Sequence, residues 1–311
     1  MPSYSGIWSL SQQFQAVGQG LWPVPDGTFA IFALGAVSAA GTTTRNKYTY
    51  SGCVVGAATA ATVASRFGSA YGNSTVGIFA LGWTPNAVST TRNKYTYASD
   101  VVSTGGAATV ASAFGSAAGN STVGIFALGN DAICKTVTRN KYTYSGDAVA
   151  SATAATVASS SGAAVGNSTV GIFALGLNNL DSPLTTRNKY TYSGDVVSAG
   201  GAATAASYYG AAAGNSTVGI FQLGNTGSAS TTRDKYTYAG DVVGAATAAT
   251  AASQSGSAAG NSTIGIFALS NCSAARNRYT YSGDVVAVGG AATAVSGGGS
   301  AASNGTAGVN I

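Results

Sequence analysis

The stretch Thr185-Thr-Arg-Asn-Lys-Tyr-Thr-Tyr-Ser-Gly-Asp-Val-Val197 returns six times in this chain of 311 residues, with few changes. Its arginine stands at positions 45, 92, 139, 187, 233 and 276, so successive copies lie 43 to 48 residues apart. A second block, Gly-Ile-Phe-Ala-Leu-Gly, keeps the same phase, with its isoleucine at positions 31, 78, 125, 172, 220 and 266. A period of roughly 20 to 50 residues is typical of propellers and solenoids. The sequence therefore predicts one supersecondary unit copied along a single domain.

One copy, residues 68–111, has the pattern of four short β-strands. Gly68–Tyr71 is a strand of small residues, and the Gly-Asn pair after it is a hairpin-turn signal because both residues tolerate positive φ. Residues 74–81 form an apolar strand rich in β-branched and aromatic residues. Arg92–Tyr97 is the third strand, and the fourth begins at Asp100 after a tight turn. Four short antiparallel strands per repeat form the blade of a β-propeller.

The two ends of the chain predict how the ring closes. The tail, Ser300–Ile311, aligns with the first two strands of a copy, and the head, Gly6–Ala16, resembles a degenerate third and fourth strand. Joined, they would add one blade to six complete ones and leave no open sheet edge. We therefore expect an all-β, seven-bladed β-propeller of four-stranded antiparallel blades, with a closing blade shared by the N- and C-termini. The expected parts of this single domain, 1–311, are the outer strands of the closing blade in 1–20, six repeats in 21–298 and the inner strands of the closing blade in 299–311.

This order of strands, loop, Lys-Tyr-Thr-Tyr and turn resembles the kelch-like propeller unit over almost the whole chain. The double glycine of that family is a single residue here, and the family's fourth-strand Trp is a Val. The repeats are also similar to arrays in bacteriophage and environmental bacterial proteins. The resemblance implies a virion or surface protein that binds through the face carrying the interblade loops. The residues at the glycine position are Gly35, Gly82, Gly129, Gly176, Gly224 and Ser270.

Differences between the copies collect in two of the four connections: the loop from one blade to the next, and the loop between the second and third strands. Alternate turns of an antiparallel meander lie at the same end, so both variable connections are expected on one face of the disc, named here the variable face. Function is usually carried by loops on a rigid scaffold. The alternative is that loops drift while strands cannot, and that aromatic pairs only fill blade junctions. Candidate binding residues are Arg66, Phe67, Phe114, Tyr208, Tyr209 and Gln254 near the axis, and Trp83, Asn86, Asn130, Asp131, Lys135, Asn178 and Asp181 farther out.

The side-chain chemistry argues against an enzyme. There is no His and no Glu, which excludes Ser-His-Asp triads, Cys-His pairs and histidine metal sites. No Asp-x-Asp-x-Asp cluster exists for a hard cation, so no metal and no cofactor are expected. The alternative is an Asp/Tyr/Arg site in the central channel. Five recurring turn aspartates are expected to accept local backbone N–H bonds, the Arg-x-Lys pairs to lie at a solvated strand edge, and the paired tyrosines to pack between blades. These aspartates are Asp100, Asp147, Asp195, Asp241 and Asp284.

Charge and hydropathy limit the kinds of partner that this chain is expected to bind. Twelve of the 14 basic residues belong to the repeats, so the net charge of +5 is dispersed and argues against nucleic-acid binding. No stretch reaches about 18 apolar residues, so no membrane insertion is expected, and no Sec signal peptide is evident. We expect a non-enzymatic structural or binding propeller, namely a bacteriophage virion protein for host attachment or capsid and tail decoration, such as a tail-fiber component. Its partners would be other virion or surface proteins or a host glycan, and oligomeric assembly is compatible with the sequence. The alternative is a bacterial surface or secreted, lectin-like carbohydrate-binding protein.

Overall fold

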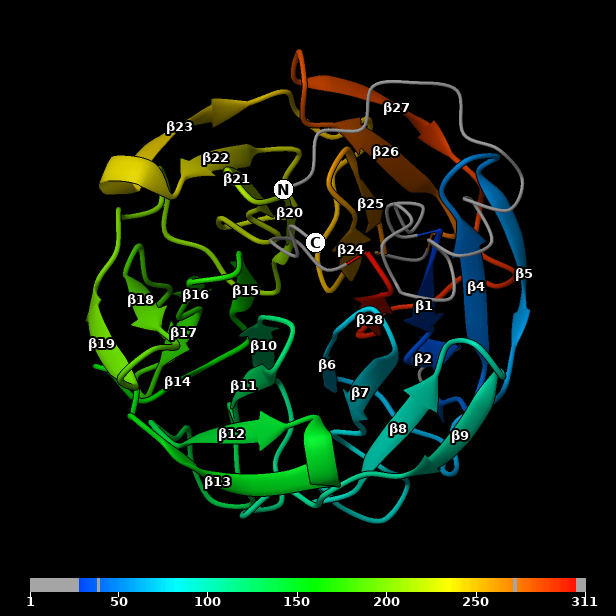
Figure 1. Ribbon diagram of the computed structural model, residues 1–311. Helices are drawn as coiled ribbons and strands as arrows, with labels where there is room; N and C mark the ends of the chain where they lie inside the picture. The colour runs from blue at the N-terminus through cyan, green and yellow to red at the C-terminus, as the bar shows by residue number, and fades with distance from the viewer. Residues whose placement is uncertain (1–27, 38–39, 271–272, 306–311) are drawn as a thin grey trace, which may run out of the picture.

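The computed structural model describes residues 28–37, 40–270 and 273–305. These residues form six four-stranded antiparallel sheets, arranged as blades around a central axis (Figure 1). In each blade the first strand lies nearest the axis and the fourth lies at the rim. The predicted all-β propeller of four-stranded antiparallel blades is therefore confirmed.

Blade 2 shows the strand order. β6 (Ser69–Gly72) pairs with β7 (Val76–Ala80), β7 with β8 (Arg92–Thr96), and β8 with β9 (Val101–Thr104). The other blades, from inner to outer strand, are blade 1 with β28 (Ser300–Ser303), β1 (Phe29–Ala33), β4 (Arg45–Thr49) and β5 (Val54–Ala58); blade 3 with β10 (Ser116–Gly119), β11 (Val123–Ala127), β12 (Arg139–Thr143) and β13 (Ala148–Ala152); blade 4 with β15 (Ala163–Gly166), β16 (Val170–Ala174), β18 (Arg187–Thr191) and β19 (Val196–Ala199); blade 5 with β20 (Ala211–Gly214), β21 (Val218–Gln222), β22 (Arg233–Thr237) and β23 (Val242–Ala246); and blade 6 with β24 (Ala258–Gly260), β25 (Ile264–Ala268), β26 (Arg276–Thr280) and β27 (Val285–Gly289). Short elements in the connections are β2 (Ala36–Val37) with β3 (Ala40–Gly41), β14 (Ser159–Ser160) with β17 (Leu177–Asn178), and the 3-10 turns η1 (Ser145–Asp147) and η2 (Ala239–Asp241).

The ring closes through β28, the last described strand. β28 pairs antiparallel with β1, with Ser300 opposite Ala33, and it packs against the inner strands β6 and β24 of both neighbouring blades. The tail therefore completes the first repeat, and the described residues form six blades rather than the predicted seven. That prediction was wrong because it gave the tail a second strand as partner, although β1 already holds that position. The strands expected in residues 1–20 and in residues 306–311 lie outside the described residues.

Six buried arginines join each blade to the next. Each is the first residue of a third strand, is at most 1% exposed, and holds its guanidinium carbon 4.4 to 4.7 Å from the centre of a phenylalanine ring in the next blade. Its Nη2 donates to a side-chain oxygen of that blade at 2.7 to 3.3 Å. The prediction that these arginines lie at a solvated strand edge was wrong, because neighbouring blades cover both faces of each sheet. The contacts are Arg45 with Phe79 and Asn93, Arg92 with Phe126 and Asn140, Arg139 with Phe173 and Asn188, Arg187 with Phe221 and Asp234, Arg233 with Phe267 and Asn277, and Arg276 with Phe32 and Asn46.

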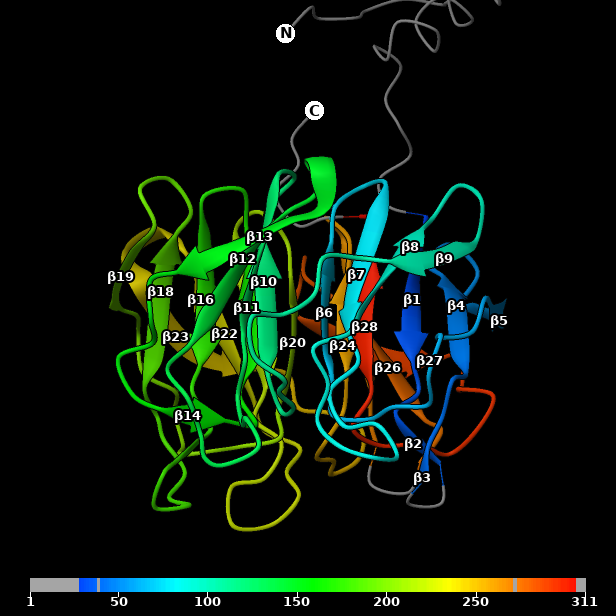
Figure 2. The ribbon, with the colours of Figure 1, turned by 90° about the horizontal axis from the view of Figure 1, so that it is seen from below.

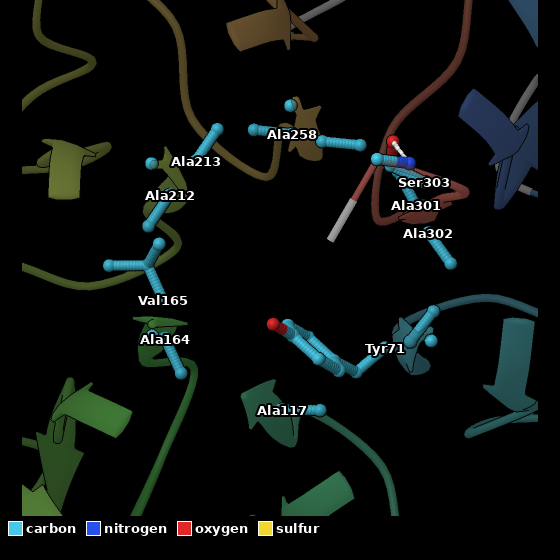
Figure 3. Close-up of a pocket in the computed structure, with 17 residues that line it drawn as sticks. Tyr71, Ala117, Ala164, Val165, Ala212, Ala213, Ala258, Ala301, Ala302 and Ser303 are labelled. Carbon is cyan, nitrogen blue, oxygen red and sulfur yellow. Dashed lines mark hydrogen bonds between the residues drawn. The ribbon is translucent and has the colours of Figure 1, made fainter. Parts of the chain in front are cut away.

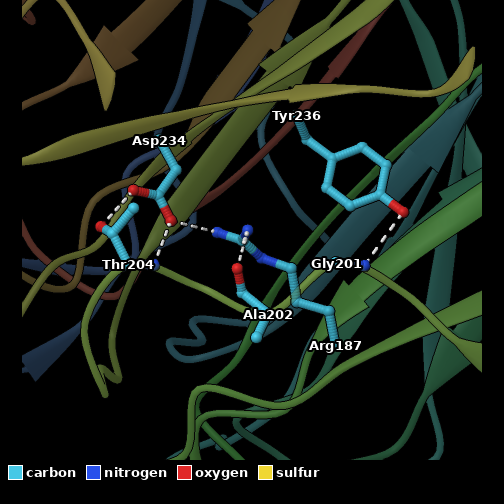
Figure 4. Close-up of polar contacts among 6 residues, drawn as sticks. All are labelled: Arg187, Gly201, Ala202, Thr204, Asp234 and Tyr236. Carbon is cyan, nitrogen blue, oxygen red and sulfur yellow. Dashed lines mark hydrogen bonds and ion pairs between the residues drawn. The ribbon is translucent and has the colours of Figure 1, made fainter. Parts of the chain in front are cut away.

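One of these junctions contains a carboxylate. Asp234 replaces the asparagine of the other copies, and its Oδ2 lies 2.7 Å from Nη2 of Arg187 (Figure 4). The other oxygen, Oδ1, accepts a hydrogen bond of 2.5 Å from the Thr204 hydroxyl. In a junction with asparagine, the hydrogen bond to the threonine hydroxyl runs the other way. There Nδ2 of Asn93 donates to Oγ1 of Thr62 at 2.8 Å. Both residue types therefore satisfy the same arginine and threonine positions.

Close contacts explain two glycines of blade 2. A Cβ atom at Gly72 would lie 2.3 Å from the carbonyl oxygen of Val76 and 2.9 Å from the hydroxyl oxygen of Tyr97, and a Cβ at Gly77 would lie 2.7 Å from the same hydroxyl. In blade 1, serine occupies the position of Gly72, and the Tyr50 hydroxyl donates to Oγ of Ser303 at 2.8 Å. These tyrosines are buried between blades, as the sequence predicted.

The recurring turn aspartates are structural, although their contacts differ from those expected. Oδ1 of Asp147 accepts a 2.6 Å bond from the Tyr142 hydroxyl, and Oδ2 lies 2.9 Å from Nζ of Lys94 in the preceding blade. Burial alone would raise the pKa of Asp147, but these two donors outweigh it and lower the pKa below its usual value. In alternate blades a threonine takes the place of lysine, as where Thr59 donates its backbone N–H to Asp100 at 3.0 Å.

Removing β28 tests the closure of the ring. Ending the chain after Gly299 should expose the edge of β1 and the inner strands of both neighbouring blades, and should lower the melting temperature by about 10 °C or more. Ending it after Gly305 keeps β28 and serves as the control. Thermal unfolding followed by circular dichroism measures both, and equal melting temperatures would refute closure through β28.

The Asp234 junction yields a second prediction. Asp234→Asn recreates the pattern of the other five junctions, so it should change the unfolding free energy by less than about 1 kcal/mol. Asp234→Ala leaves the buried Arg187 guanidinium and Thr204 without their acceptor and should cost about 3–5 kcal/mol. Urea unfolding measures both variants. Equal losses would show that the acceptor at this position is unimportant.

Candidate binding face

In blades 1 to 5 the two variable connections lie together and are hydrogen-bonded to each other. The backbone N–H of Arg66 donates to the carbonyl of Trp83 at 2.9 Å, and the N–H of Trp83 donates back at 2.8 Å. Both connections therefore open on one face, as predicted, and Figure 2 shows it at the bottom, where β2, β3 and β14 lie. Similar pairs of bridging residues are Ala113 with Asn130, Tyr208 with Asn225, and Ala36 with Gly297.

A closed ring of six backbone hydrogen bonds surrounds the axis at this face. One residue from each interblade loop donates its N–H to the carbonyl of its counterpart in the preceding loop, at 2.6 to 2.8 Å. All six have positive φ, from 54° to 64°. A left-handed backbone costs a non-glycine residue about 1–2 kcal/mol, and the shared hydrogen bonds offset this strain. The members of this axial ring are Phe67, Phe114, Ser161, Tyr209, Ser255 and Gly298.

The aromatic members of the axial ring pack on one another. The rings of Phe67 and Phe114 are stacked with centroids 4.4 Å apart, and the ring of Tyr209 lies 6.1 Å from Phe114 and 4.9 Å from Tyr208. A Cβ at Gly298 would lie 2.5 Å from the Phe67 ring, so glycine is needed there. These predicted residues are therefore brought together, and their half-buried packing supports the alternative that they fill blade junctions.

The remaining near-axis candidates have partners within the variable connections. The guanidinium of Arg66 lies 5.4 Å from the centre of the Phe67 ring. Gln254 accepts a hydrogen bond of 2.6 Å from Nδ2 of Asn225. Both side chains are half-buried.

The outer candidates shape three neighbouring loops. Nζ of Lys135 in blade 3 lies 2.5 Å from Oδ1 of Asp181 in blade 4, which ties two loops together. Oδ1 of Asp131 accepts the backbone N–H groups of residues 133 and 134 at 2.7 and 2.8 Å, and hydrogen bonds from the N–H groups of Cys134 and Ile133 lower the pKa of that carboxyl. Oδ1 of Asn178 accepts from the N–H groups of residues 180 and 182 in the same way. Asn130 is half-buried, and Asn86 and Trp83 are exposed at the blade 2 loop.

Two exposed residues were missed by the sequence analysis. Ile133 is 92% exposed and Leu180 is 83% exposed, at the tips of the loops that Lys135 and Asp181 join. The available signal was a large aliphatic residue in the middle of a loop that also contains Asn and Asp. Polar and aromatic residues drew attention instead, although an exposed aliphatic tip is the less expected observation.

The central channel holds a cavity of about 60 Å³, lined by the inner strands β6, β10, β15, β20, β24 and β28 (Figure 3). The ring of Tyr71 projects from β6 into this cavity, and burial raises the pKa of its hydroxyl. The described residues that line this cavity include neither Asp nor Arg. The residues at the position of Tyr71 in the other blades are Ala118, Val165, Ala213, Ala259 and Ala302.

Within residues 28–37, 40–270 and 273–305, no group of three or more His, Cys, Asp or Glu side chains is placed to hold a metal ion. In the same residues, no helix has the length and apolar character needed to cross a membrane.

Comparison with known proteins identifies the fold. No family model matches the chain, and no curated protein matches it. The solved structure of YjhT superposes with a TM-score of 0.61, over 86% of this chain and 98% of that chain. The two share a propeller fold. Their sequences are 10% identical, so the likeness to YjhT supports the architecture and carries no argument about activity.

The axial ring yields a prediction with a matched control in the next residue. Gly298→Ala places a methyl group against the Phe67 ring at a positive φ and should cost about 2 kcal/mol or more. Gly297→Ala meets only Oγ of Ser270 at 3.8 Å and should change stability little. Urea unfolding compares the two variants. Equal free energies of unfolding would contradict the prediction, because they would mean that the Phe67 side chain moves aside without loss of stability.

Proposed function

We propose that this chain is a non-enzymatic binding propeller that holds a protein partner on its variable face. One observation carries the proposal. Among the described residues, the exposed large apolar side chains other than valine are Trp83, Ile133 and Leu180. All three lie on the loop between the second and third strands of consecutive blades, 2, 3 and 4. Exposed apolar groups that gather on one face mark interaction sites.

These loops have the rigidity that recognition favours. Asp131 and Asn178 each accept two backbone N–H groups within their own loops, and Lys135 pairs with Asp181 across them. A loop held in one conformation loses less entropy on binding, which increases affinity. The neighbouring axial ring supplies a fixed base for the same face.

The chemistry of the loop tips favours a protein over a glycan. Isoleucine and leucine have no hydrogen-bonding group for sugar hydroxyls, whereas they fit the apolar pockets that anchor protein interfaces. The proposed setting is a bacteriophage virion, with the partner a neighbouring virion protein or a host surface protein. That setting is supported by the resemblance of the repeats to phage arrays. The lectin-like alternative remains as an outcome of the test.

Photo-cross-linking tests the proposal. A photoreactive amino acid at Ile133 or Leu180 should cross-link the chain to one protein in the native assembly, identified by mass spectrometry. The same amino acid at Val54, which is 61% exposed at the rim on β5, is the control and should not reach that protein. Purified virions containing the cross-linked pair at a fixed ratio to the capsid protein would support the virion setting.

Two results would contradict the proposal. Cross-links from Val54 but not from Ile133 or Leu180 would move the interface to the rim. Selective binding on a glycan array, unchanged by replacing Ile133 and Leu180 with serine, would favour the lectin-like alternative.

A further inference from the structure

Three blade junctions contain a small cavity beside a buried arginine. At the one lined by Arg276, Nη1 of the arginine donates to the Gly290 carbonyl at 3.5 Å, and the arginines at the other two have no such bond. A cavity of about 10 Å³ is lined by Arg45 and Ser65 between blades 1 and 2, and another of about 10 Å³ is lined by Arg92 and Ser112 between blades 2 and 3. Each has room for about one water-sized sphere. One water molecule therefore fits, a halide ion fits if the lining moves outward slightly, and sulfate, phosphate or a carboxylate does not fit.

The arginines at these cavities have unused hydrogen-bond donors. Nε and Nη1 of Arg45 and of Arg92 are buried and have no hydrogen-bond partner among the described residues. Their Nη2 atoms donate to neutral asparagine oxygens, at 3.1 Å in both junctions. A buried cation without a counter-charge is costly, and burial lowers the pKa of both guanidinium groups to about 10. The cavity at Arg45 is also lined by a second arginine, Arg66.

Another junction of the same chain shows what such a site binds. The residue opposite each arginine on the neighbouring strand is alanine in five blades and Gln222 in blade 5. Oε1 of Gln222 accepts hydrogen bonds from Nε and Nη2 of Arg233, at 3.3 and 3.0 Å. Its Nε2 donates to Oγ of Ser253, which holds the repeat position of Ser65 and Ser112. The glutamine thus places an acceptor between arginine and serine, where Ala80 leaves the cavity beside Arg92.

The geometry points to a halide site in the cavities beside Arg45 and Arg92: one chloride ion bound by Nε and the second N–H of Nη2 of Arg45 beside Ser65, and one by the same atoms of Arg92 beside Ser112. This is the edge of the guanidinium that Gln222 occupies on Arg233. Chloride supplies the acceptor that Gln222 supplies in blade 5, together with the counter-charge that Asp234 supplies to Arg187. A water molecule satisfies the donors but leaves the buried charge uncompensated.

Anomalous X-ray diffraction from crystals of the full chain grown in sodium bromide tests the inference. Bromide peaks are expected beside Arg45 and Arg92, and none is expected beside Arg233, where Gln222 occupies the space. Ala80→Gln should remove the peak at Arg92. Ala33→Gln changes the residue opposite Arg45 and should leave the Arg92 peak in place, because Ala33 does not line that cavity. Gln222→Ala is the reverse variant and should create a peak at Arg233.

A solution measurement gives a second readout. At equal ionic strength, the melting temperature should be higher in sodium chloride than in sodium gluconate, whose anion is too large for the cavity, by about 2 °C or more. Ala80→Gln should reduce that difference. Density for ordered water without anomalous signal at both arginines would overturn the inference, as would equal melting temperatures in the two salts. A peak at Arg92 that persists in Ala80→Gln would also contradict it.

Discussion

The structure depends on a guanidinium group held between two blades. Each repeat contributes an arginine that lies over the phenylalanine of the next blade and donates to an asparagine or aspartate there. A cation over an aromatic ring is worth most where water is excluded. Arg276 of blade 6 lies over Phe32 of blade 1, so the contact also joins the last blade to the first. Every blade therefore contributes an arginine to one neighbour and receives an arginine from the other.

This arrangement separates the residues that must repeat from those that are free to vary. The glycines beside Tyr97, the turn aspartates and the buried arginines each have a partner fixed by geometry, so a change in one copy would require a matching change in its neighbour. Asp234 and Gln222 show that such changes do occur when hydrogen bonding is preserved. The loops between the second and third strands lack these constraints, and Ile133 and Leu180 are found there.

Much of the architecture could be predicted from the sequence because the repeat supplied six versions of one blade. The four strands and the common face of the variable loops followed from turn residues and antiparallel geometry. The blade number did not, since the tail was matched to two strands of a further blade although β1 needed only one partner. Arg92 was misplaced because strand alternation assigns one face to solvent, whereas a stacked blade has two covered faces. The axial ring could not be foreseen, because Phe67, Ser161 and Gly298 share a backbone conformation and no side-chain type.

The axial ring also has a sense of rotation. Every N–H in it points toward the carbonyl of the preceding loop, so the six bonds circulate in one direction and their dipoles largely cancel around the circle. The hydrogen bonds form a closed circle, so a chain that began in any other blade could still form all six of them. The covalent ends of the chain are therefore incidental to this part of the molecule, which behaves as a macrocycle closed by hydrogen bonds.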